Sequence, residues 1–80
     1  MEDQIKQIMA YAFNMPVHKL TEYCTSETIE GWDSLSHLTM IAEFESAFDI
    51  SFSPSEIEEY KSYQQISESV ARKLKEINAK

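Results

Sequence analysis

Glycine, proline and cysteine are scarce in this chain of 80 residues, which contains one glycine, two prolines and one cysteine. So few turn-forming residues argue against a β-sandwich or a β-barrel, whose many short strands need frequent turns. The single Cys24 excludes an internal disulfide, and together with His18 and His37 it shows no metal-ligand spacing. We therefore interpret Cys24 as structural or incidental, predict no metal site, and expect a reducing, cytoplasmic setting as the default.

Lysine and arginine are absent from residue 20 to residue 60, a stretch that carries ten carboxylates. The whole chain has a formal net charge of −7. A nucleic-acid-binding protein needs a basic face, and an anionic membrane surface repels acidic proteins, so we expect neither partner. No long apolar run begins the chain, so neither a signal peptide nor a membrane span is predicted. The acidity suits either a solvated surface or an electrostatic contact with basic partners.

The length of the chain suits one domain, which we expect to span residues 1–80. A core of this size supplies a net stability of only about 3–5 kcal/mol. A deep catalytic cleft would remove much of that core, so the length argues against an enzyme.

Apolar residues make up 42% of the chain and recur at helical spacing almost throughout. Helices are expected over residues 2–14, before Pro16 stops the pattern, and from 33 or 34 to 48. Two more are expected from 53 and from 62, where Ser53 with Glu56 and Ser62 with Gln65 predict capping boxes. The third is short, and residues 15–33 form a long first connection, which is usually a sign of function. The predicted fold class is an all-α bundle of three main helices and one short helix.

The apolar stripes of these helices predict the core. The expected core residues are Ile5, Ile8, Met9, Ala12 and Phe13; Leu35, Leu38, Ile41, Phe44 and Phe48, with Met40 and Ala47 beside them; Ile57 and Tyr60; and Tyr63, Ile66, Val70, Leu74 and Ile77. The residues expected to anchor the long connection are Val17, Leu20, Tyr23 and Ile29.

Ser34 stands where the long connection meets the second helix, in the run Gly31-Trp32-Asp33-Ser34-Leu35. Gly31 allows a turn there without steric cost, and Asp33 is a favourable N-cap. The first N–H groups of a helix lack internal partners and lie at the positive end of the helix dipole, so a phosphate ester on Ser34 would be stabilised. On their own, Asp and Ser in this position are most often ordinary capping residues.

The chain resembles the acyl carrier proteins over essentially its whole length. The resemblance rests on Asp33-Ser34-Leu35 after Gly31, on Phe48-Asp49-Ile50 followed by Phe52, and on a short acidic helix that begins at Pro54. It implies a four-helix, acyl-carrier-like bundle without enzymatic activity. A phosphopantetheinyl transferase would move 4′-phosphopantetheine from coenzyme A onto Ser34, and the chain would become a phosphoprotein. The thiol of the arm would then carry an acyl group as a thioester for fatty-acid or polyketide biosynthesis.

The resemblance also implies roles in partner recognition. Asp33 would help the transferase to recognise the site, and Leu35 would anchor the helix start or contact partners. From the charge pattern rather than the resemblance, we expect Glu43 and Glu45 to meet basic patches on acyl-loading and acyl-transfer enzymes, which a monomeric carrier would visit in turn.

Three positions depart from the family pattern. Ser36 and Thr39 stand where the family often has acids, and Trp32 stands where fatty-acid carriers usually have a small residue. A specialised acyl, polyketide or polysaccharide pathway is therefore favoured over housekeeping fatty-acid synthesis.

Two alternatives stay open. Ser34 and His37 are three residues apart, as a hydrolase nucleophile and base could be, but no strand pattern supplies the usual α/β scaffold. An acidic bundle without an arm could also bind a basic partner directly. We expect His37 to be exposed or half-buried and Trp32 to pack into the bundle. The residues that could line an acyl site between helices are Met9, Met40, Phe44 and Ile57.

Overall fold

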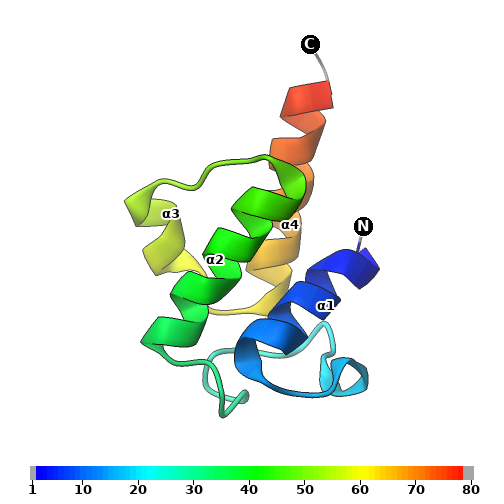
Figure 1. The fold of residues 1–80 in the computed structure, drawn as a ribbon, viewed down its shortest axis with the longest axis vertical. Coiled ribbons are helices and arrows are strands. Elements are labelled where there is room, and N and C mark those ends of the chain that lie inside the picture. The colour runs from blue at the N-terminus through cyan, green and yellow to red at the C-terminus, as the bar shows by residue number, and fades with distance from the viewer. Residues whose placement is uncertain (1, 79–80) are drawn as a thin grey trace.

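The computed structural model describes residues 2–78 and is helical over most of that range. Its elements are α1 (Glu2–Phe13), a 3-10 turn η1 (Val17–Lys19), α2 (Ser34–Phe48), α3 (Pro54–Glu59) and α4 (Tyr63–Asn78). In Figure 1, α1 and α3 lie on either side of α2, and α4 runs behind it. The predicted all-α class is confirmed, with η1 as the one element that the sequence did not indicate. Within the described range, no helix is both long and apolar enough to span a bilayer.

Two helix starts follow the local chemistry that the sequence predicted. The Asp33 carboxylate accepts a hydrogen bond from the Ser36 N–H at 2.8 Å, so Asp33 is the N-cap of α2. Ser53 and Glu56 form a complete capping box at α3, with Pro54 in its first turn. Each contact satisfies an amide that the helix itself cannot bond.

The capping box predicted for α4 is shifted by one residue. Ser62 Oγ accepts from the Gln65 N–H at 3.2 Å, as expected. The Gln65 side chain, however, accepts from the Lys61 N–H at 2.8 Å rather than from the N–H of Ser62. The backbone of Ser62 is instead part of an isolated antiparallel bridge with Thr25.

Two residues with left-handed backbone follow the first two α-helices. Asn14 follows α1 with φ 54°, and Asp49 follows α2 with φ 55°. Asn and Asp adopt this conformation more readily than most residues, so both helices end before a continuing turn can form. The α1 helix therefore ends at Phe13, ahead of the Pro16 that the sequence indicated as the stop.

One apolar core joins α1, α2 and α4. Its most deeply buried large side chains are Phe44, Ile5, Met9, Met40, Ile66 and Val70. All six were predicted from helical periodicity. Leu20 and Ile29 of the long connection are also buried, as predicted.

Several predicted core residues are exposed. The exposed ones are Val17, Tyr23, Leu35, Leu38, Ala47 and Ile77. On α2, three-residue steps rotate by about 300°, so the series Leu35, Leu38, Ile41 drifts around the helix, and only its last member reaches the core. Leu35 and Leu38 are 76% and 56% exposed.

Two of the other exposed predictions, Tyr23 and Ile77, have local causes. In the long connection Cys24, not Tyr23, packs against the core, and its thiol accepts from the Thr21 N–H at 3.3 Å. The last turns of α4, which contain Ile77, extend beyond the other helices (Figure 1).

The long connection is tied to the start of α4 by two backbone hydrogen bonds. The Ser26 N–H donates to the Lys61 carbonyl at 2.8 Å, and the Tyr63 N–H donates to the Cys24 carbonyl at 3.0 Å. These bonds flank the bridge of Thr25 with Ser62. They fix the connection against the start of α4 before it reaches α2.

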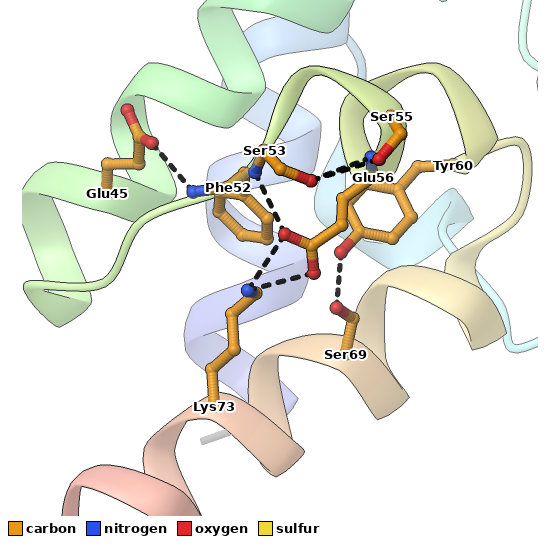
Figure 2. A network of polar contacts seen from close by, with 8 residues as sticks. All are labelled: Glu45, Phe52, Ser53, Ser55, Glu56, Tyr60, Ser69 and Lys73. Carbon is orange, nitrogen blue, oxygen red and sulfur yellow. Dashed lines mark hydrogen bonds and ion pairs between the residues drawn. The ribbon is translucent and has the colours of Figure 1, made fainter.

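A polar network fixes α3 against α4 (Figure 2). Lys73 Nζ lies 2.9 Å from one carboxylate oxygen of Glu56 and 3.1 Å from the other. The hydroxyl of Tyr60, the residue that follows α3, is hydrogen-bonded to that of Ser69 on α4. A helix of six residues is too short to be stable by itself, so these contacts determine where its backbone lies.

Candidate functional site

Ser34 is the first residue of α2, and its side chain is exposed. The neighbours Asp33 and Leu35 are exposed as well, so an enzyme can reach this serine from outside the bundle. The core packing of α1 against α2 and the Asp33 cap hold the helix start in place.

Asp33 is ionised at neutral pH. The hydrogen bond from the Ser36 backbone N–H, followed by one from the Ser36 side chain, lowers the pKa of the Asp33 carboxyl below its ordinary value. The carboxylate therefore already occupies one of the helix-start amides that the sequence suggested for a phosphate ester. A phosphate ester on Ser34 would therefore share the helix start with a negative neighbour.

Gly31 is required by a close approach rather than by a turn. A Cβ at this position would lie 2.2 Å from the Phe13 carbonyl oxygen, well inside contact distance. The φ angle of Gly31 is not positive, so conformational freedom is not the reason for glycine. The correction matters because this contact brings the connection against the end of α1, three residues before Ser34.

Trp32 is buried and begins a chain of contacts that ends on α3. Its burial agrees with the expected packing into the bundle, and its ring stacks on Phe13 with centroids 4.7 Å apart. Its Nε1–H donates to His37 Nδ1 at 2.9 Å. Because the indole is only a donor, His37 Nδ1 accepts, and Nε2 carries the proton that it donates to the Ile57 carbonyl at 2.7 Å.

A groove of about 530 Å³ opens beside Ser34. Ser34 and Leu38 line it from α2, and Ile57 lines it from α3. Trp32 and His37 also line this groove. A larger groove of about 870 Å³ lies along the long connection and meets the first at Asp33.

Comparisons with known proteins agree with this geometry. Residues 27–70, which include Ser34, match the family model described as the phosphopantetheine attachment site. The chain belongs to this family. It is also similar to the solution structure of a holo acyl carrier protein from Geobacter metallireducens, with a TM-score of 0.85 and 27% identity. That alignment covers 98% of this chain and 90% of the other. A search of curated proteins gave no match.

Membership of the acyl carrier protein family makes the chain a carrier rather than an enzyme, with 4′-phosphopantetheine as its covalent cofactor. The residues present fit that group. An exposed serine at a helix start offers a hydroxyl for a phosphodiester, and the adjoining groove leaves room for an arm.

The carrier does not have the arrangement that a serine hydrolase needs. Both ring nitrogens of His37 are already bonded, one to Trp32 and the other to Ile57, and the ring is half-buried as expected. A general base must accept a proton from the nucleophile, and neither nitrogen is available to Ser34.

The predicted partner-recognition acids lie in different surroundings. Glu43 is exposed on α2. Glu45 is half-buried, and its carboxylate accepts from the Phe52 N–H at 3.0 Å (Figure 2). Glu45 therefore also stabilises the connection from α2 to α3.

Within residues 2–78, no group of three or more His, Cys, Asp or Glu residues could hold a metal ion.

The sequence did not reveal three of these contacts. It indicated Trp32 as a packed residue and His37 as a helix residue, but not that they bond each other and α3. A Trp five positions before a His, with the helix N-cap between them, is the only sequence signal. The role of Glu45 inside the chain had no sequence signal.

Proposed function

We propose that Ser34 carries the phosphopantetheine arm and that this carrier serves a specialised acyl, polyketide or polysaccharide pathway. The observation that carries the first part is the exposure of Ser34 at the capped start of α2, inside the segment that matches the attachment-site family. The finer assignment to a pathway depends on the side chains around it.

Attachment needs a hydroxyl that a transferase can reach. The Ser34 Oγ would form a bond to the phosphorus that bears the pantetheine of coenzyme A. The phosphoanhydride bond of coenzyme A would break, its nucleotide part would leave with the bond's electrons, and the hydroxyl proton would pass to a base on the transferase. The bound arm supplies a thiol that holds an acyl group as a thioester.

The surface around Ser34 suits enzyme partners with an apolar contact and basic patches. Leu35 and Leu38, which are 76% and 56% exposed, place two large apolar side chains next to the attachment point. Exposed Glu43 follows on the same helix, and residues 20–60 contain no lysine or arginine. Charge complementarity of this kind speeds encounter and weakens as salt rises.

The test of Ser34 is intact mass after incubation with coenzyme A and a broad-specificity transferase. We expect one added phosphopantetheine on the wild-type chain and none on Ser34→Ala. Ser36→Ala is the matched control, because it removes a hydroxyl two residues away and keeps the backbone N–H that Asp33 bonds. An unmodified wild type under several active transferases, or addition to Ser34→Ala, would contradict the assignment.

The pathway proposal rests on the first turns of α2. Ser36 and Thr39 are half-buried and uncharged, and the acids of this helix come later. Fatty-acid enzymes that bind carboxylates in the first turns of this helix should therefore bind this carrier weakly. We expect the double variant Ser36→Asp with Thr39→Glu to be loaded faster by a generic fatty-acid enzyme, with a gain that shrinks at high salt.

The measurement is the loading rate of wild type and double variant at two salt concentrations. Glu43→Gln, which removes one exposed charge on the same helix, is the control for a general effect of charge. A wild type that loads as fast as a housekeeping carrier would refute the specialised role and leave the attachment at Ser34 intact.

A further inference from the structure

We propose that Trp32 and His37 close the route from Ser34 into the core between α2 and α3, which restricts the acyl group to short or polar types that stay at the surface. The inference rests on the proposed function, in which Ser34 carries the arm. It makes Trp32 and His37 specificity-determining residues of this carrier.

His37 lies between Ser34 and the deepest part of the core. Residues three and four apart share a helix face, so His37 is on the same side of α2 as Met40, Ile41 and Phe44. Met40 and Phe44 have no exposed surface. An acyl chain that entered from Ser34 toward these residues would have to pass the imidazole.

The imidazole is fixed at both ends. Its Nε2–H donates to the carbonyl of Ile57, which lies in the last turn of α3. Such carbonyls have no partner within their own helix, and the Lys61 N–H, the next candidate, donates to Gln65 instead. The hydrogen bond of His37 therefore joins α2 to α3 at the point where the two helices would have to separate.

Trp32 holds the imidazole on the side that faces α1. Its indole donates to Nδ1 at 2.9 Å, and its ring stacks on Phe13 of α1. The ring planes of Trp32 and His37 are nearly parallel, with centroids 6.1 Å apart. Opening the route would break both hydrogen bonds and leave half-buried polar groups without partners, which is unfavourable.

The space that remains for the arm is the groove on the outer side of this pair. Ser34 lines it directly, so an arm on Ser34 would begin in this groove. Glu58 and Lys61 line it alongside Leu38 and Ile57, so its wall is partly charged. The groove is open to solvent, so a long apolar chain lying in it would leave part of its methylene surface in contact with water, whereas a short acyl group has few methylene groups to expose.

The experiment loads the full chain with acetyl, butanoyl and octanoyl arms from the matching coenzyme A thioesters. Intact mass confirms each loading, and thermal unfolding is then compared. For wild type we expect the same unfolding midpoint with all three arms. For His37→Ala we expect the midpoint to rise with chain length, by roughly 3–6 °C for each methylene that becomes buried.

Two further variants separate closure from general weakening. His37→Gln offers an amide N–H to the Ile57 carbonyl and should behave like wild type. Ser69→Ala removes the hydrogen bond with Tyr60 but leaves the His37 contacts in place, so it should be less stable yet independent of chain length. Trp32→Phe keeps a ring against Phe13 but removes the hydrogen-bond donor to His37. Its unfolding midpoint should therefore rise with acyl-chain length, but less than that of His37→Ala.

The outcomes are distinguishable. Absence of loading would overturn the proposed function and this inference with it. A loaded wild type whose midpoint rises from acetyl to octanoyl would overturn the inference alone. If the unfolding midpoint does not depend on arm length in any variant, including His37→Ala, the role assigned to His37 is refuted.

Discussion

The hydrogen bond from Trp32 to His37 allows a prediction whose magnitude follows from its geometry. Trp32→Phe keeps an aromatic ring near Phe13 but removes the donor that lies 2.9 Å from His37 Nδ1. An acceptor left unpaired in a buried setting costs about 1–3 kcal/mol. His37 is half-buried, so water can reach part of the ring, and the lower half of that range applies.

We therefore expect Trp32→Phe to lower the free energy of unfolding by about 1–2 kcal/mol, or the thermal midpoint by roughly 5–15 °C. The pair should also be coupled. In a double-mutant cycle with His37→Ala, we expect a coupling energy of about 0.5–1.5 kcal/mol, the net value of one hydrogen bond.

Urea unfolding followed by far-ultraviolet circular dichroism is the suitable assay. Fluorescence would fail, because Trp32 is the only tryptophan of the chain. Glu43→Ala on the exposed side of α2 should leave stability nearly unchanged and should add independently to Trp32→Phe. A coupling energy below about 0.3 kcal/mol, the usual error of additivity, would refute the cooperation of Trp32 and His37.

Two more predictions test other contacts. Gly31→Ala should destabilise the fold by about 1–3 kcal/mol in urea unfolding, because its Cβ would collide with the Phe13 carbonyl, whereas Glu30→Ala beside it should be neutral. The pKa of the Glu56 carboxyl is lowered first by the backbone hydrogen bond from Ser53 and then by Lys73. Ionised Glu56 therefore stabilises the fold fully above its unfolded pKa near 4.5, and this stabilisation is lost as pH falls through its lower folded pKa. Stability measured from pH 7 to pH 3 should fall less in Glu56→Gln, and parallel curves would contradict this.

Helix positions were predictable because their causes are local. The N-cap at Asp33 and the capping box at Ser53 each depend on residues within one turn, and both helices begin where these residues stand. The core stripe of α1 was predictable for the same reason. The Asp33-Ser34-Leu35 motif lies on one such boundary, which is why its place in the fold could be stated from the sequence.

Contacts that depend on the tertiary arrangement were not predictable in the same way. His37 and Ile57 are 20 residues apart, and only the position of α3 brings the carbonyl to the ring. Glu45 reaches the Phe52 N–H only because Asp49 reverses the chain at the end of α2. Leu35 and Leu38 were placed wrongly, because apolar spacing alone does not show which side of a helix its neighbours cover.

The bridge between Thr25 and Ser62 affects the order in which the molecule can be completed. A ribosome releases the chain from its N-terminus, so α1, the long connection and α2 are made before residue 62 is available. Until then, the Cys24 carbonyl and the Ser26 N–H lack their partners at residues 63 and 61, and the connection before Ser34 has no anchor on the last helix. We therefore expect the surface around Ser34 to reach its final shape only after the start of α4 has been synthesised, so unfinished chains should not yet present that surface to a modifying enzyme.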